Sequence, residues 1–76
     1  MSNANLYVEL DRINPLNVRC GDILSGFDGE QYTVVDVFGP KEEKIHRFMI
    51  PPYVVLEKLE EDERIKPELV TGRVEL

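Results

Sequence analysis

Two β-prone runs separated by a polar, glycine-containing loop constrain this chain more than any other feature. Residues 32–38, Tyr-Thr-Val-Val-Asp-Val-Phe, are mostly of the types that suit a pleated, half-buried surface. Residues 18–24 form a weaker run before the loop. Within the loop, Asp28-Gly29 suits a tight turn, because glycine adopts positive φ without a steric penalty. The stretch therefore predicts a strand, a turn-rich loop and a second strand.

Further short strands are predicted along the chain at regular intervals. Apolar alternation or β-prone composition places them at residues 6–10, 16–20, 45–50, 53–59 and 69–76. The predicted breaks are Asn14-Pro15, Gly39-Pro40, a charged turn at 41–44, and Pro51-Pro52. This spacing is typical of small barrels and sandwiches. The expected fold is therefore mainly β, with five or six short, mostly antiparallel strands.

Residues 56–66 leave two interpretations open. The charged segment that follows residues 53–59 favours one short helical turn near 58–65. In the alternative, 56–66 is a real helix on the sheet, with Leu56, Leu59 and Ile65 on its inner face and Pro67 ending it. The second interpretation would make the fold α+β.

Residues 18–59 resemble the small SH3-like barrels. The resemblance lies in the strand entering a long Gly- and Asp-bearing loop, the strong return strand at 32–38, and the two short strands after it. Many prokaryotic members open with Gly-Asp and two aliphatic residues, as Gly21-Asp22-Ile23-Leu24 does here. The resemblance covers about half of the chain and implies a small antiparallel barrel. It implies no function and no site residue, because such a superfold hosts unrelated functions.

The length and charge of the chain narrow the classes of function. A chain of 76 residues is one domain, here residues 5–76. Residues 1–4 are set aside, because Ser2-Asn3-Ala4 resembles an expression-tag remnant. The net charge of −6 repels a phosphate backbone and disfavours binding to duplex nucleic acid. Without an apolar run of membrane-spanning length or a secretory leader, the chain is predicted to be cytoplasmic, with no membrane contact.

Few residues of this chain could act as a nucleophile or bind a metal ion. Cys20 is the only cysteine and His46 the only histidine, so an internal disulfide is impossible and a metal site is disfavoured. Cys20 shares its predicted face with Leu16 and Val18, which favours a small buried hydrophobic residue over a nucleophile. The acids of the 22–36 region, namely Asp22, Asp28, Glu30 and Asp36, are expected to form turns rather than to bind a cation. The sequence thus predicts no enzyme, no catalytic residue, no metal ligand and no cofactor.

Two predicted strands are apolar on both faces. If Thr33, Val35 and Val37 face inward, Asp36 stays in water, but the apolar side chains next to it on that face are exposed too. If Tyr32, Val34 and Phe38 face inward instead, Asp36 is buried or lies at the rim of the core, and an unpaired buried charge is costly. Residues 53–56 pose the same problem. Either other segments of the chain or a partner must cover the second face. The side chains predicted to bind a protein partner, or a second copy in a homo-oligomer, are Tyr32, Val34, Phe38 and Tyr53.

Residues 41–48 hold the one basic cluster, formed by Lys41, Lys44, His46 and Arg47 close to two phenylalanines. Bases beside aromatic rings are the ingredients of single-strand nucleic-acid binding. Glu42 and Glu43 cancel much of this charge, so a solvated hairpin turn is the favoured interpretation. The acidic run at 57–63 is likewise expected to be solvated.

The sequence is therefore expected to encode a non-enzymatic protein-interaction or accessory module, of a size that phages and mobile elements encode. Two alternatives stay open. One is a nucleic-acid accessory domain that uses the 41–48 turn, and the other is a small ligand- or metal-sensing domain that uses the 22–30 loop.

Overall fold

The computed structural model describes residues 5–75, so the expectations for residues 1–4 and for Leu76 fall outside it. Its strands are β1 (Asn5–Glu9), β2 (Ile13–Asn14), β3 (Ile23–Gly26), β4 (Gln31–Phe38), β5 (Lys41–Glu43), β6 (Phe48–Ile50), β7 (Tyr53–Lys58) and β8 (Gly72–Val74). Three short 3-10 turns are η1 (Leu10–Arg12), η2 (Glu61–Glu63) and η3 (Pro67–Leu69). The predicted mainly β class is confirmed.

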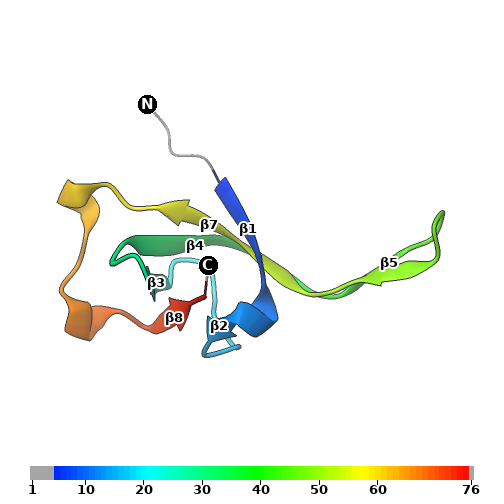
Figure 1. Cartoon of the computed structure of the whole chain (residues 1–76), viewed down its shortest axis with the longest axis horizontal. Coiled ribbons are helices and arrows are strands. Elements are labelled where there is room, and N and C mark those ends of the chain that lie inside the picture. The colour runs from blue at the N-terminus through cyan, green and yellow to red at the C-terminus, as the bar shows by residue number, and fades with distance from the viewer. Residues whose placement is uncertain (1–4, 76) are drawn as a thin grey trace.

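Six of these strands form one curled sheet, which bends into a half-barrel (Figure 1). The order across the sheet is β1-β7-β4-β3-β8-β2, and neighbours are antiparallel except for β3 with β8, which are parallel. The two edge strands, β1 and β2, follow one another in the chain with only η1 between them. One short segment therefore supplies both edges of the sheet.

The core lies on the inner face of this curl. Its buried residues are Val8, Ile13, Val18, Leu24, Tyr32, Val34, Val54, Leu56 and Val74. In β7, Val54 and Leu56 face inward because side chains alternate along a strand. Removing these side chains from water supplies the main driving force for folding.

A β-bulge in β4 resolves the conflict between the two apolar faces of that strand. Val34 and Asp36 pair with successive residues of β7, so Val35 is an extra residue without a partner. The inward side chains are therefore Tyr32 and Val34 before the bulge and Val37 after it, and Asp36 stays exposed. Neither of the two regular alternations considered for residues 32–38 holds along the whole strand.

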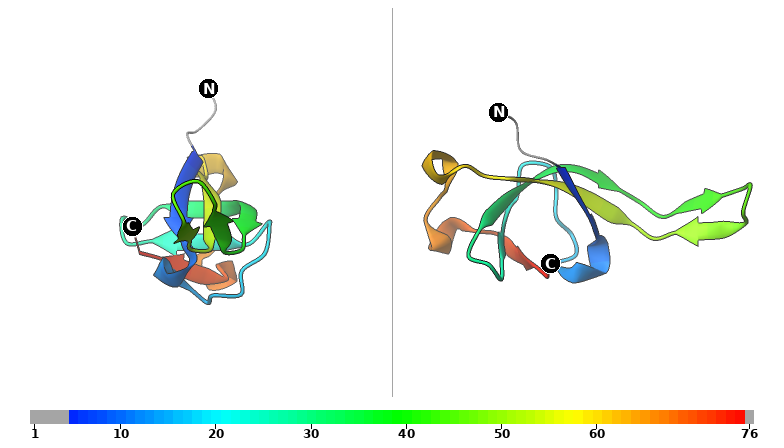
Figure 2. Two further views of the ribbon diagram at one scale, coloured as in Figure 1. Left: turned by 90° about the vertical axis from the view of Figure 1, so that its right-hand side faces the viewer. Right: turned by 45° about the horizontal axis from the view of Figure 1, so that its top comes forward.

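The β5–β6 hairpin, residues 41–50, projects from the sheet as an extension of the β4–β7 ribbon, and we call it the arm (Figure 2, right). Gly39-Pro40 and Pro51-Pro52 interrupt the two sides of the ribbon at its base, as predicted. The molecule is elongated as a result, with extents of 44 × 28 × 20 Å.

The predicted turn at 41–44 and strand at 45–50 are wrong in position. The turn lies at 44–47, where Arg47 adopts a φ of 56°, and charged residues 41–43 form a strand because an exposed hairpin need not bury them.

The strand predicted at residues 16–20 is absent. Val18 alone enters the core, whereas Leu16 is 58% exposed and Cys20 is exposed at a turn. The turn is closed by Asp22, whose N–H donates to the Arg19 carbonyl at 3.0 Å and whose Oδ2 accepts the Arg19 N–H at 2.8 Å. These local hydrogen bonds override the apolar alternation.

The segment after β7 confirms the predicted short helical turn and not the longer helix. Glu60 and Glu63 form a reciprocal capping box around η2. Leu56 belongs to β7, and Leu59 follows this strand and donates its N–H to the Gln31 carbonyl at 2.8 Å.

The predicted strand at 69–76 is shorter in the structure, since residues 67–69 form η3 and only residues 72–74 pair in the sheet. In residues 5–75, no helical segment has the length and apolar character needed to cross a membrane.

Candidate interaction surface

Of the four side chains predicted to bind a partner, two lie in the core and two at the surface. Tyr32 and Val34 are buried in the chain's own core, because the first half of β4 faces inward. That part of the prediction is corrected. Phe38 and Tyr53 lie on the outer face of the sheet, where their rings stack with centroids 4.9 Å apart and planes 20° apart.

Tyr7 extends this pair into a row of three rings on three neighbouring strands. Its ring centroid is 5.9 Å from that of Tyr53, and the residue is 71% exposed. Sequence reasoning missed Tyr7 as a surface residue, although the inward alternation of Leu6 and Val8 already implied that it faces outward. Exposed aromatic rings offer large contact areas at low conformational cost, which makes them common anchors at interfaces.

A shallow hollow of about 350 Å³ lies where this row meets the arm. Its lining residues are Tyr7, Glu9, Lys41, Ile50, Pro51 and Tyr53. Phe48 shares a face of β6 with Ile50, because the two are separated by one residue. The apolar surface therefore continues from the outer face of the sheet onto one face of the arm. We define the apolar strip as Tyr7, Phe38, Tyr53, Ile50 and Phe48.

The arm itself exposes unusually large apolar side chains. Ile45 at its turn is 84% exposed, Phe48 is 51% exposed and Met49 is 61% exposed. Met49 pairs with Glu42 and lies on the face of the arm opposite to Phe48. The exposed apolar side chains are thus distributed over the turn and both faces of the arm.

The predicted basic cluster is spread along the same arm. Lys41, Lys44, His46 and Arg47 are all exposed. Glu43 holds His46 in place, because its Oε2 accepts the His46 backbone N–H at 2.6 Å and lies 3.1 Å from the ring Nδ1. The His46 ring also lies 6.2 Å from the Phe48 ring. The cluster therefore carries a carboxylate within it.

Asp28 acts as a hydrogen-bond acceptor within the 22–30 loop. Its Oδ1 accepts the Glu30 N–H at 3.0 Å, and its Oδ2 accepts the Tyr32 hydroxyl at 3.0 Å. The backbone bond from Glu30 is the largest cause that lowers the pKa of Asp28 below its usual value. Burial, and then the bond to Asp28, raises the pKa of Tyr32 to about 12. Asp28 thus fixes the turn and satisfies the hydroxyl of a core tyrosine.

The neighbouring acids are engaged as well. Asp36 Oδ1 accepts the Val37 N–H at 2.9 Å, next to the bulge. Glu30 pairs with Lys58 at 3.7 Å and with Arg64. Among residues 5–75, no group of three or more His, Cys, Asp or Glu side chains is placed to hold a metal ion. The contacts therefore give these carboxylates structural roles.

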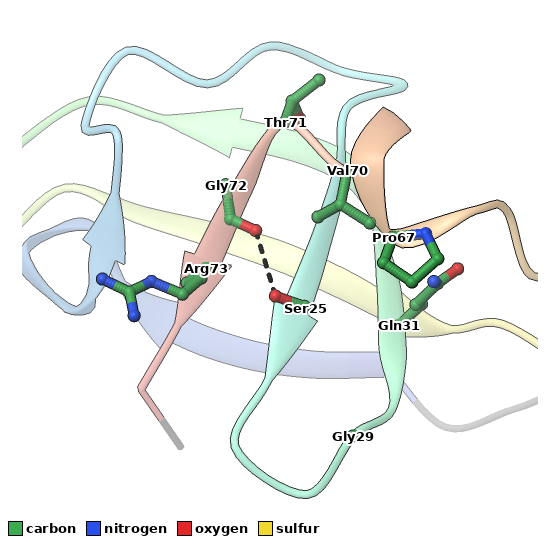
Figure 3. Close-up of a pocket in the computed structure, with 8 residues that line it drawn as sticks. All are labelled: Ser25, Gly29, Gln31, Pro67, Val70, Thr71, Gly72 and Arg73. Atoms are coloured by element: carbon green, nitrogen blue, oxygen red, sulfur yellow. Dashed lines mark hydrogen bonds between the residues drawn. The ribbon is translucent and has the colours of Figure 1, made fainter.

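A second hollow lies beside the β3–β8 pair, with a volume of about 450 Å³ (Figure 3). Its polar side chains are mostly engaged within the chain. Ser25 Oγ donates to the Gly72 carbonyl at 3.5 Å, Thr71 Oγ1 donates to the Ile23 carbonyl at 3.0 Å, and the Gln31 amide bonds the backbone of Ile65. Arg73 extends away from the other labelled side chains (Figure 3). No set of acid, base and nucleophile converges here among the described residues.

Comparison of the sequence and structure with protein-family models, with curated proteins and with solved structures gave no match in any of the three.

Proposed function

We propose that this chain is a non-enzymatic protein-interaction module that binds a partner protein through the apolar strip. The observation that carries the proposal is the continuity of Tyr7, Tyr53 and Ile50 around the hollow at the base of a projecting arm. A partner that inserts an apolar side chain into the hollow would bury the rings on both sides of it. Aromatic anchors that close around one central pocket are typical of strong protein contacts.

Charge supports a partner with a basic rim. The chain has a net charge of −6, and the wall of the hollow holds one acid, Glu9, and one base, Lys41, so the overall charge carries this argument. Complementary potentials accelerate encounter more than they tighten the final complex. The association rate is therefore expected to fall as salt rises, whereas the dissociation rate stays nearly constant. A cytoplasmic site of action remains a prediction from the sequence.

The test compares the two faces of the arm. The chain is used to capture partners from native lysate, and the affinity of the purified partner is then measured by calorimetry. Phe48→Asp should weaken binding by at least tenfold, because it places a carboxylate in the apolar strip. Met49→Asp is the matched control, since it carries the same charge on the adjacent residue and the opposite face. Equal losses in both variants, or no loss in either, would refute the strip as the binding surface.

A second candidate, the nucleic-acid accessory domain, draws support from the exposure of all four bases on the arm. Its test is retention on single-stranded nucleic acid at about 150 mM salt. Retention that disappears when Lys41, Lys44 and Arg47 are all changed to Glu would favour this candidate over the protein module. Absence of retention at low micromolar protein would remove it.

A further inference from the structure

The two edges of the main sheet differ sharply in their protection. The β2 edge is only two residues long and is followed at once by Pro15, so it offers little backbone for pairing. The β1 edge is five residues long, and its sequence Asn-Leu-Tyr-Val-Glu contains no proline, glycine or lysine. Natural sheets commonly guard exposed edges with proline or with charged side chains, lysine above all, and β1 carries only Glu9 at its end. Among the described residues, β1 is therefore the less protected edge of the main sheet.

The backbone of β1 presents alternate residues to this open side. Leu10 donates its N–H to the Pro52 carbonyl at 2.9 Å, and β1 pairs with β7 in the same register. Because hydrogen-bonded pairs alternate along an antiparallel ladder, Leu6 and Val8 direct their backbone groups toward β7. Asn5, Tyr7 and Glu9 then direct theirs away from the sheet. A hollow of about 320 Å³ lies along this side, lined by Tyr7, Val8, Glu9, Arg12 and Glu75.

We propose that two copies of this chain pair their β1 strands antiparallel about a two-fold axis through Tyr7. This register sets Tyr7 opposite Tyr7 of the second copy, and Asn5 opposite Glu9. All three outward-facing residues then form hydrogen-bonded pairs, which exchange about six backbone hydrogen bonds. The inference goes beyond the proposed function and does not depend on it, because the pairing uses the backbone edge and not the arm.

The side chains of β1 are self-complementary in this register. The order polar, apolar, aromatic, apolar, polar is the same in both directions. Leu6 meets Val8 of the second copy, and the two Tyr7 rings join the aromatic rows of both copies into one. Glu9 faces the Asn5 amide, which can donate to it, so no like charges stand directly opposite. In this register, therefore, no side chain of β1 stands directly opposite a like charge on β1 of the second copy.

The expected affinity is modest, because a five-residue edge gives an interface at the small end of specific complexes. Sedimentation velocity of the full chain, from about 10 to 500 μM, should show a monomer–dimer equilibrium in which the dimer fraction rises with concentration. Amide hydrogen exchange adds a residue-level signature. Tyr7 and Glu9 N–H should gain protection as the concentration rises, whereas Leu6 and Val8 N–H should be protected throughout. A strict monomer over this range would overturn the proposal.

Charge variants at Asn5 test the register. Asn5→Lys places a cation opposite Glu9 of the second copy, and Asn5→Glu places two carboxylates together. Since the contact occurs twice in the dimer, the Kd values of the two variants should differ by about tenfold, with Asn5→Lys the tighter. Both Asn5 and Thr33 pair with Glu57, from opposite sides. Thr33→Lys and Thr33→Glu therefore reproduce the effect inside the chain and should leave the Kd unchanged.

Two other results would also contradict the proposal. If the Kd of the dimer is the same in both Asn5 variants but the dimer is lost in Phe48→Asp, self-association occurs through the arm. A chain that stays monomeric, while the Asn5 variants change its capture of another protein, would show that the edge accepts a foreign strand. Circular dichroism of every variant checks that a change in Kd does not arise from unfolding.

Discussion

Among the polar side chains of this fold, Gln31 is expected to contribute most to the free energy of unfolding. It is buried at the start of β4, with 7% of the residue exposed. Its Nε2 donates to the Ile65 carbonyl at 2.8 Å, and its Oε1 accepts the Ile65 N–H at 2.9 Å. The amide thus makes the two hydrogen bonds with the Ile65 backbone that a neighbouring strand would make. It ties the long connection between β7 and β8 to the centre of the sheet.

Gln31→Leu removes both hydrogen bonds while keeping most of the buried volume. Each neutral hydrogen bond contributes roughly 0.5–1.5 kcal/mol, and water replaces part of what is lost because Ile65 is half-buried. The free energy of unfolding should therefore fall by about 1–3 kcal/mol. A 76-residue domain has about 4–11 kcal/mol in total, so the melting temperature should drop by about 5–20 °C. Urea denaturation followed by circular dichroism measures the free energy of unfolding, and thermal denaturation measures the melting temperature.

Gln31→Glu provides the matched variant. At neutral pH, its carboxylate keeps the acceptor for the Ile65 N–H but faces the Ile65 carbonyl without a donor. Burial and this repulsion raise the pKa of the new carboxyl above its unfolded value of about 4.3. Its stability relative to wild type is therefore greatest below that pH and is lost as pH rises through the folded pKa. A Gln31→Leu loss below about 0.5 kcal/mol, the scale of a surface change, or a flat pH profile for Gln31→Glu, would refute the reasoning.

Three further predictions concern single residues. Burial and the bond to Asp28 raise the pKa of Tyr32 from about 10 in the unfolded chain to about 12. The contribution of Tyr32 to the free energy of unfolding should therefore be fully present below pH 10 and fall by up to about 2–3 kcal/mol between pH 10 and 12. Tyr32→Phe should abolish this pH dependence in alkaline denaturation. Gly72→Ala should cost at least about 2 kcal/mol in urea denaturation, because its Cβ would lie 2.3 Å from the Asn14 carbonyl oxygen; an unchanged midpoint would contradict this contact. Cys20 should react with a thiol reagent in the native protein nearly as fast as in urea, since it is exposed; slow native labelling would restore the buried assignment.

The strands that local composition predicts well are the ones at the centre of the sheet. Residues 32–38 and 53–59 are rich in β-branched and aromatic residues, and they became β4 and β7. The breaks at Gly39-Pro40 and Pro51-Pro52 were also predictable, because proline cannot donate to a ladder. These features depend on residues that are close in sequence, so the sequence displays them directly.

The missed elements depend on contacts between distant segments. β2 is two residues long and cannot display a period, and it exists because Ile13 pairs with Val74. The parallel pairing of β3 with β8 joins segments nearly fifty residues apart, as in the contact between Leu24 and Gly72. Apolar alternation at 16–20 pointed to a strand, but the local bonds of Asp22 to Arg19 favoured a turn.

The candidate surface was predicted in part. Phe38 and Tyr53 were expected at the surface and lie there, stacked on each other. Tyr32 was assigned to the same face because a regular strand of period two offers no other choice. The sequence contains no signal for the extra residue that changes the parity, so the burial of Tyr32 and the exposure of Phe38 could not be predicted together.

The bulge therefore gives the sharpest test of this register. Deleting Val35 leaves Val34, Asp36, Val37 and Phe38 to pair with successive residues of β7, as they already do. Every inward and outward side chain keeps its face, and only an exposed valine is lost. The variant should fold, with a loss below about 2 kcal/mol that reflects the twist supplied by the bulge.

Deletion of Val37 is the control, because it moves Phe38 by one position and turns its ring toward the core. That variant should lose several kcal/mol, as expected when a buried apolar residue is removed and the ladder is displaced. Urea denaturation and two-dimensional NMR spectra distinguish the two outcomes. If the Val35 deletion unfolds as readily as the Val37 deletion, the bulge is required for the curl of the sheet, and the pairing register alone does not account for the position of the aromatic row.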